Sequence, residues 1–333
     1  MSVLLNNNKI MSLLEANKRA GYDRNEGFLM DLEKEHHSLD VLPFYPASDN
    51  SFHKYSKATK LGSGNWRDVN EGREHTFGST ESITSPVQIF SAETNISDDV
   101  LRLADNAGDV RDSENLLVAT GLVEDFMGTL IYGDVDYATG TRDYNPKKMH
   151  GFANHRDKLG EFCLSAGGSG TDLTSIYVVY FGEYGVNVRY NPKLTGGADG
   201  IGLSIRDEGA VWTKDQNNRD MKTWKTVYDL TAGLEVRRDK ALVRIANVKA
   251  DGTGTFPVDK VISAIMSMPN GASGACILAP KPVEEMLMKY AFSASQYQIT
   301  SDVIEGFGPL TRVMGVPVIR EEAIKIGERA ITA

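Results

Sequence analysis

Hydrophobic and polar residues alternate almost without a break between Trp224 and Val236. One set of alternate positions is mostly apolar, and the other carries most of the charge: Trp224, Thr226, Tyr228, Leu230, Ala232, Leu234 and Val236 against Lys225, Val227, Asp229, Thr231, Gly233, Glu235 and Arg237. A period of two predicts a half-buried β strand. At about 3.3 Å per residue this stretch would span roughly 43 Å, well beyond the common strand length of about 5–6 residues. The pattern therefore predicts an unusually long strand that carries no residue suited to catalysis.

A helical period follows the segment 112–132. Its apolar residues recur at helical spacing: Leu116, Leu117, Val123, Phe126, Met127, Leu130 and Ile131. Asp112 or Ser113 can cap the start and Gly133 the end, which predicts a helix over 113–132, about 30 Å long. Gly121 and Gly128 lie on one face, and each lowers helix propensity by roughly 1 kcal/mol. We interpret this pair as a sign that another backbone approaches closely.

Two further regions have distinct patterns. Residues 175–250 contain several strand-like runs, including SIYVVYFGEYGVNVRYNP with a turn near Gly182–Gly185, and predict one sheet of long strands. After Phe256, helical and strand-like runs alternate: VDKVISAIMSM with Pro257 at its start, GACILAP, PVEEMLMKYAF and TRVMGVPVI. The order helix, strand, helix, strand predicts a compact α/β unit.

The first 92 residues are poor in apolar surface. Residues 1–46 contain two short helical pieces, MSLLEANKRAG and Gly27–Ser38, and end at LPFYP, so we expect an arm that lies on something else. Residues 47–92 are polar and glycine-rich, and Gly62-Ser63-Gly64 predicts a turn between two extended limbs with charge on both faces.

Such a hairpin has no core side, and an isolated two-stranded hairpin is marginal in water. It is either disordered or laid across a neighbouring molecule. We favour the neighbour, because Phe52, Tyr55 and Trp66 would be costly to leave exposed.

Composition narrows the class of protein. The chain has 333 residues, 41% hydrophobic and 24% charged, as is ordinary for a globular protein. No run of about 18 apolar residues predicts a membrane span, and the start lacks a secretory pattern, so a reducing cytoplasm is expected. Cys163 and Cys276 are expected to be buried free thiols. The net charge of −9 argues against tight contact with nucleic acid, but not against lying near it.

Candidate metal sites fail on spacing. His36 and His37 are adjacent and would point about 100° apart on a helix. His150 and His155 have no Cys or acidic partner at ligand spacing. Asp134-Val135-Asp136 resembles the start of a calcium loop, but the oxygen ligands and the glycine that should follow are missing.

Candidate phosphate and nucleophile motifs fail as well. GGADGIG at 196–202 does not read as a phosphate-binding loop. No G-x-G-x-x-G opens a helix there, and no Lys-Ser or Lys-Thr pair follows a glycine loop. GASGA around Ser273 has Ala275 where a nucleophile elbow has glycine, and it precedes a strand. We therefore predict no catalytic residue, no cofactor and no metal. A chain with an uncovered hairpin, an arm and long strands is instead expected to cover copies of itself.

The order of segments closely resembles a major capsid protein of tailed bacteriophages, of a podovirus-like subfamily. The resemblance covers nearly the whole chain and rests on these stretches in this order: an arm, a charged hairpin, a helix ending in GTLIYGD, then GFANHRDKL, SIYVVYFGEYGVNVRYNP, WKTVYDLTAGLEVRRDKALVRIANV and a final unit ending in MGVPVI. The implied fold is the one shared by tailed-phage shells, herpesvirus floor proteins and encapsulins.

The resemblance implies an α+β fold with four parts. These are an N-terminal arm at 1–46, an extended β-hairpin loop at 47–92, a peripheral domain at 93–250 and a compact α/β axial domain at 251–333. The peripheral domain would hold a spine helix at 113–132 and long antiparallel strands at 175–250. In many relatives the long peripheral strands follow the axial helices, whereas here they precede them.

The implied function is structural. The chain would self-assemble into pentamers and hexamers of an icosahedral head that encloses double-stranded DNA, in virions assembled in the host bacterial cytoplasm. Implied partners are a separate scaffolding protein, a portal protein and decoration proteins, with DNA only in non-specific proximity and no membrane. The arm leaves no room for a cleaved scaffolding segment, and no acid or Asn partner is identified for a Lys isopeptide crosslink. The candidates for inter-subunit contact are Phe52, Lys54, Tyr55, Lys57, Lys60, Trp66, Arg67, Asp68, Glu71, Arg73 and Glu74.

Two alternatives stay open. One is an encapsulin-like compartment of the same fold that encloses cargo enzymes rather than DNA. The other is an enzyme, such as a hydrolase using Ser273 or His155.

Overall fold

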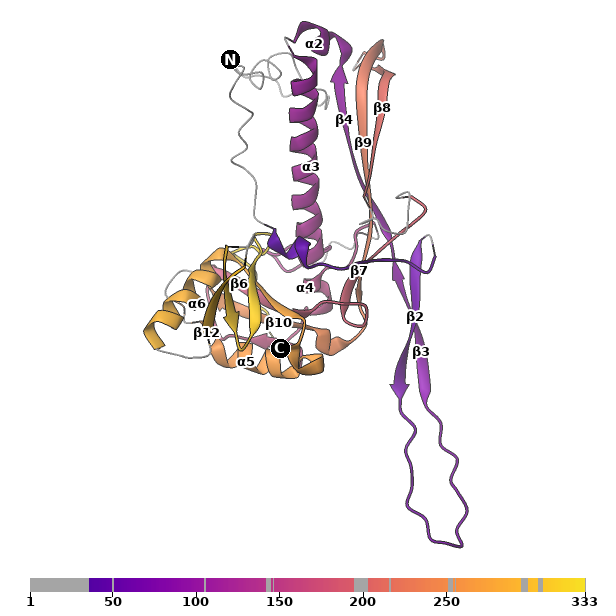
Figure 1. The fold of residues 1–333 in the computed structure, drawn as a ribbon, viewed down its shortest axis with the longest axis vertical. Helices are drawn as coiled ribbons and strands as arrows, with labels where there is room; N and C mark the ends of the chain where they lie inside the picture. Colours follow the sequence, from indigo (N-terminus) through magenta and orange to yellow (C-terminus); the bar gives the residue numbers. More distant parts are fainter. Residues whose placement is uncertain are drawn as a thin grey trace.

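The computed structural model describes residues 36–49, 51–104, 106–141, 145, 147–194, 203–215, 217–250, 254, 256–294, 299–304 and 308–332. The predicted helical piece at 11–21, and most of that at 27–38, lie outside these residues. The described chain begins with a 3-10 turn, η1 (His37–Asp40). Figure 1 shows a long helix beside long strands, a layered α/β part at their foot, and a hairpin that projects away from both.

The long helix is α3 (Ala107–Tyr132). Its 26 residues span about 39 Å. It begins at Ala107 rather than at 113, because the side chain of Asn106 caps it by accepting a hydrogen bond from the Gly108 amide at 3.2 Å. It ends at Gly133, whose φ of +62° favours glycine and where a Cβ would lie 2.4 Å from the Gly151 nitrogen. One side of the C-terminal half is buried, and α2 (Asp98–Leu103) lies at the other end.

Another backbone was expected to approach Gly121 and Gly128 closely. Within one subunit this expectation is wrong, because no heavy atom lies within 4 Å of a Cβ built at either position. Replacing either glycine by alanine should therefore stabilise the unassembled subunit by about 0.5–1 kcal/mol, since alanine restricts the unfolded chain and fits the helix. Urea unfolding measures the effect. Gly133→Ala is the matched control and should destabilise, and a loss of stability in G121A would contradict the open surface.

A five-stranded sheet contains the long strand β9 (Asp220–Val236), whose 17 residues span about 56 Å. One edge of β9 pairs with β4 (Gln88–Ser97), and the other pairs with β8 (Leu203–Lys214) and then β7 (Val186–Tyr190). A short parallel strand, β1 (Phe44–Pro46), extends the sheet beyond β7. The predicted long strand is confirmed, with Tyr228, Leu230, Ala232 and Leu234 only 4–6% exposed.

A seven-stranded sheet forms the second layer. Its spatial order is β12 (Ile299–Ile304), β13 (Gly308–Val313), β14 (Val316–Arg320), β11 (Ala275–Ala279), β6 (Leu173–Tyr180), β10 (Leu242–Lys249) and β5 (Cys163–Ser165). Ile176 and Val178 belong to the same core cluster as residues of α5 (Val258–Ser267) and α6 (Lys281–Ala294). Tyr177 and Val179 pack with α4 (Phe152–His155) and the end of α3. The sheet is thus covered on both faces, and it combines strands from after Phe256 with β5, β6 and β10 from earlier in the chain.

The expectation of one sheet over residues 175–250 is wrong. β6 and β10 pair in the seven-stranded sheet, whereas β7, β8 and β9 belong to the other. The chain crosses between the sheets at Gly182–Gly185 instead of forming a hairpin, because both faces of β6 are buried in the layered part. TRVMGVPVI likewise forms two strands around a turn at Met314-Gly315. The boundaries proposed for the peripheral and axial domains stay a prediction.

Both cysteines are free and buried. Burial raises the pKa of each thiol, so neither has the thiolate character that a nucleophile needs. Within the described residues, no helix is long and apolar enough to cross a membrane.

The hairpin consists of β2 (Phe52–Lys60) and β3 (Ser79–Pro86). Beyond their ladder, residues 61–78 continue as two extended limbs that reverse at Asp68–Glu71, where the Glu71 amide donates to the Asp68 carbonyl at 3.2 Å (Figure 1). The predicted turn at Gly62–Gly64 is therefore wrong. The Asp68 carboxylate accepts from the Val69 amide at 2.9 Å and stabilises the actual turn.

Candidate functional site

The far end of the hairpin, residues 61–78, is here called the hairpin tip. Four large apolar side chains on it are exposed: Leu61 (82%), Trp66 (104%), Val69 (88%) and Phe77 (74%). Several large apolar side chains exposed together on one short projecting segment are typical of interaction sites. The hairpin is therefore the candidate functional site of the chain.

Polar contacts at the tip are local. Arg67 Nη1 donates to the Glu71 carbonyl at 2.8 Å, and the Asp68 amide donates to Glu71 Oε2 at 3.0 Å. The Asn65 side chain donates to the Glu74 carboxylate. These contacts shape the turn but leave the apolar side chains uncovered.

The root of the hairpin is held by a buried charge cluster, here called the hairpin anchor: His53, Arg189, Glu235 and Arg237. Glu235 is fully buried on β9, and its two carboxylate oxygens accept from Arg189 Nε at 2.6 Å and Arg237 Nε at 3.1 Å. Arg189, on β7, also donates to the Pro46 carbonyl at 3.3 Å. Charged hydrogen bonds in a buried site are strong, so the anchor joins β7, β9 and the hairpin root.

His53 is neutral in this cluster. Its Nδ1 accepts a hydrogen bond from the Ser48 amide at 3.0 Å, which a doubly protonated ring could not do. Nε2 lies 3.5 Å from Glu235 Oε1 and 3.1 Å from Arg237 Nη2. Burial lowers the pKa of His53; Glu235 opposes this, while Arg189 and Arg237 add to it.

Acidification should therefore weaken the anchor. A histidine with a depressed pKa in the folded state leaves stability unchanged above its ordinary value of about 6.5 and lowers it as the pH falls below that. Protonation would also remove the bond from Ser48, since Nδ1 would become a donor. Urea unfolding between pH 7.5 and 5 should show the free energy of unfolding falling more in the wild type than in His53→Gln. If the free energy of unfolding fell equally with pH in the wild type and in His53→Gln, the depressed pKa of His53 would be contradicted.

The return strand of the hairpin crosses β9 next to the anchor. A Cβ on Gly233 would lie 2.3 Å from the Pro86 carbonyl oxygen, so only glycine allows this approach. This crossing covers the second face of β9 near its end, which explains why Thr231 and Glu235 are buried. The strand that the alternation predicts to be half-buried is therefore buried on both faces at these positions.

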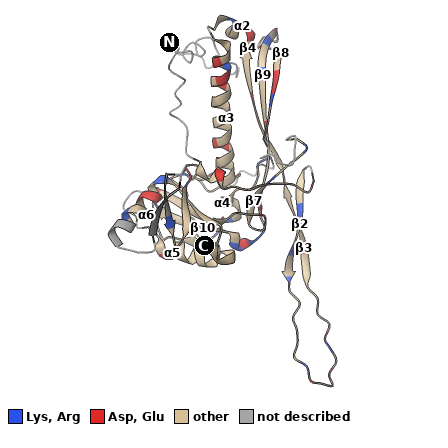
Figure 2. Ribbon diagram, viewed as in Figure 1, with Lys and Arg blue, Asp and Glu red and all other residues tan. Residues whose placement is uncertain are grey.

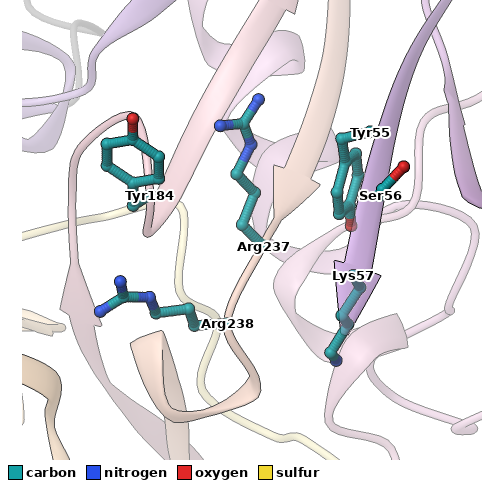
Figure 3. A pocket seen from close by; sticks show the side chains of 6 residues that line it. All are labelled: Tyr55, Ser56, Lys57, Tyr184, Arg237 and Arg238. Atoms are coloured by element: carbon teal, nitrogen blue, oxygen red, sulfur yellow. The ribbon is translucent and has the colours of Figure 1, made fainter. Parts of the chain in front are cut away.

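A cavity of about 230 Å³ lies beside the anchor, where β2 leaves the body (Figure 3). It is lined by Tyr55, Ser56, Lys57, Tyr184, Arg237 and Arg238. The Arg237 guanidinium lies between two aromatic rings, 5.5 Å from the centroid of Tyr55 and 5.7 Å from that of Tyr184. Lys57 Nζ lies 2.6 Å from Asp239 Oδ2.

The structure divides the predicted contact residues into two groups. At the root, the Tyr55 hydroxyl lies 3.5 Å from the Val236 carbonyl oxygen, Lys57 pairs with Asp239, and Lys54 Nζ lies 4.8 Å from the Phe52 ring centroid. Lys60 ends β2, with its Nζ 5.4 Å from the Phe77 ring centroid. The others lie at the tip: Trp66, Arg67, Asp68, Glu71, Arg73 and Glu74. That any of them contacts another subunit stays a prediction.

Sequence reasoning missed the anchor and the apolar tip residues Leu61, Val69 and Phe77. The only sequence signal for the anchor was the charge of Glu235, in a strand that the alternation predicts to be half-buried. Its partner Arg189 is 46 residues away and on another strand, so the pair cannot be located without the fold.

The described residues that were weighed for a chemical centre do not come together as one, and the GGADGIG segment at 196–202 lies outside the described residues. The rings of His150 and His155 lie 6.4 Å apart, and Asp134 is buried and bound by the side chain of Asn154. Across the described residues, no group of three or more His, Cys, Asp or Glu side chains could hold a metal ion.

Acidic residues follow the long helix, as Figure 2 shows by colour. α3 carries five acids, Asp109, Asp112, Glu114, Glu124 and Asp125, and one basic residue, Arg111. Arg111 Nη2 pairs with Asp207 on β8 at 2.9 Å. The exposed side of the helix is thus negative, which disfavours contact with phosphate.

Comparisons with known proteins identify the family of the chain and its fold. A family model described as "Major capsid protein GP7" matches residues 30–332. No curated protein matches significantly. A chain from the structure of bacteriophage epsilon15 is 23% identical, with a TM-score of 0.70, covering 99% of this chain and 100% of that one. The capsid of bacteriophage JBD30 is 10% identical, with a TM-score of 0.50, covering 94% and 98%. The SrpI encapsulin of Synechococcus elongatus is 12% identical, with a TM-score of 0.48, covering 70% and 95%.

Proposed function

The chain belongs to the major capsid protein GP7 family, and from this premise we propose that its copies form pentamers and hexamers of an icosahedral head enclosing double-stranded DNA. The two phage structures share its fold over nearly the whole chain. The role is structural, without catalysis, cofactor or metal.

The uncovered hairpin tip is the observation that carries the proposal. From Lys60 to Val69 the extended limb reaches about 30 Å beyond the last strand pair, at roughly 3.3 Å per residue. Its apolar side chains are therefore far from the core of their own subunit. In a shell the tip lies over a neighbouring subunit, and these side chains become buried there. Many modest contacts of this kind stabilise a closed assembly together.

The charge of the chain fits a container for DNA. A net charge of −9 and an acidic α3 leave packaged DNA free rather than bound. We further propose a separate scaffolding protein, a portal protein and decoration proteins as partners, with assembly in the host bacterial cytoplasm. Contacts between subunits are non-covalent in this proposal, since Lys57 pairs with Asp239 and no Asn partner is identified for any hairpin lysine.

Expression followed by electron microscopy tests the proposal. The chain is produced alone and with the products of its neighbouring genes, and each sample is imaged unfixed. Closed icosahedral particles, or flat rings of five and six, are expected, and particles only with a partner would identify the scaffold. A monomer under every condition would contradict the proposal. The encapsulin-like compartment and the hydrolase are not proposed, because no feature of the described residues favours either.

A further inference from the structure

The cavity at the hairpin root has an excess of positive charge. Three cations line it, Lys57, Arg237 and Arg238, and their acidic partners Asp239 and Glu235 are not part of the lining. Every residue with a charge that lines the cavity is basic. This local excess is unusual in a chain whose acids outnumber its Lys and Arg residues by 45 to 36.

The two acids are already engaged. Glu235 is shared by Arg189 and Arg237, and Asp239 accepts from Lys57 at 2.6 Å. Arg238 is exposed and forms no ion pair with any described residue, and Figure 3 shows its side chain extending below Tyr184. Its guanidinium is therefore available, whereas that of Arg237, only 17% exposed, points another way and already donates to Glu235 (Figure 3).

The lining suits a carboxylate. A guanidinium presents parallel N–H donors that match two carboxylate oxygens, and partial burial strengthens such a pair. The phenols of Tyr55 and Tyr184 and the hydroxyl of Ser56 add possible donors. The space, about 230 Å³, is several times the roughly 30 Å³ that one water occupies in the liquid.

We propose that this cavity binds a carboxylate side chain presented by a second copy of the chain, with Arg238 as its main partner. The inference rests on the proposed function and deepens it, since it assigns a receiving site in the shell. Because Lys57 lies on β2 and Arg238 follows β9, a carboxylate bound here contacts both the hairpin and the body. The bound group thereby holds the hairpin at a set angle.

A second copy is favoured as the source because of charge and position. Another copy carries more acids than Lys and Arg residues, 45 against 36. The hairpin's own tip cannot supply the group, since Lys57 and Val69 are separated by about 40 Å of extended chain at roughly 3.3 Å per residue. A contact between different surfaces of two copies is of the kind that closes rings.

Carbodiimide coupling in assembled particles tests the inference. Arg238→Lys places a primary amine at the cavity, and the reagent joins an amine only to a carboxylate in contact with it. Particles are formed from mixed isotopically labelled and unlabelled R238K subunits, coupled, digested and analysed by mass spectrometry. We expect a peptide that links residue 238 to an Asp or Glu of another copy, present in particles and absent from unassembled subunits. Arg238→Gln, which has no amine, is the matched control and should lack this link.

Three outcomes would overturn the inference. Particles without a link between copies at residue 238 would refute the site while leaving the proposed function intact. Saturable binding of inorganic phosphate to unassembled wild-type subunits, with no such link in particles, would assign the cavity to a free anion. Failure of the wild-type chain to form particles would overturn the proposed function and this inference with it.

Discussion

Replacing residues 61–78 by a two-residue Asn-Gly turn should abolish assembly while leaving the melting temperature of the subunit nearly unchanged. The tip makes its hydrogen bonds within the hairpin, and its four large apolar side chains are exposed. Removal of the tip should therefore lower the stability of the folded subunit only slightly. In the shell, burial of each such side chain contributes about 1.5–3 kcal/mol, so the loss over many interfaces is large.

Sedimentation velocity and thermal unfolding of the same samples measure the two parts of this result. Trp66→Ala should reduce assembly in the same direction but less, because three apolar side chains remain. Asn70→Ala, in the turn itself, is the matched control and should assemble normally. Particles of normal size and yield from the shortened hairpin would show that the tip is not an assembly element.

Glu235→Ala should cost the subunit about 3–5 kcal/mol of folding stability, the range for breaking a buried ion pair by removing one partner. Glu235 is fully buried, and Arg189 is 5% exposed in its side chain. Without the carboxylate, two guanidinium groups would face each other and His53 in a buried site. We expect the hairpin root to separate from β9 before the rest of the subunit unfolds.

Urea unfolding of Glu235→Ala and Asp229→Ala provides the comparison. Asp229 lies on the same strand and the same face, but its partner Arg206 is 58% exposed, so its loss should cost only about 0–1 kcal/mol. Equal losses for the two variants would contradict the buried anchor. The loss of stability in Glu235→Gln should lie between the losses in Glu235→Ala and Asp229→Ala, because the amide oxygen can still accept one hydrogen bond.

Long, regular elements were predictable from the sequence. The alternation in β9 and the helical spacing in α3 each repeat over many residues, and periodicity reports which face of an element is buried. The alternation of helices and strands after Phe256 was predictable for the same reason, but not that β5, β6 and β10, from earlier in the chain, share their sheet. The hairpin was predicted from its polar, glycine-rich sequence, and the family resemblance added its expected role.

Pairing between distant segments was not predictable. Periodicity shows that β6 and β7 are strands, but nothing local to either shows that they belong to different sheets. The position of the turn in the hairpin depended on Asp68 rather than on the nearby glycines. Glu235 is buried because the return strand crosses at Gly233, and that contact joins residues far apart in sequence. These are tertiary contacts, which a one-dimensional pattern does not contain.

Hydrogen exchange of the hairpin tip, compared between free subunits and intact shells, tests the central claim most directly. In the free subunit, residues 61–78 form no strand ladder, so their amides should exchange rapidly. Because we propose that the tip lies over a neighbouring subunit in shells, we expect slower exchange of these amides there, together with a shift of Trp66 fluorescence to shorter wavelength. Equally rapid exchange of residues 61–78 in both states would contradict a role for the tip in joining subunits.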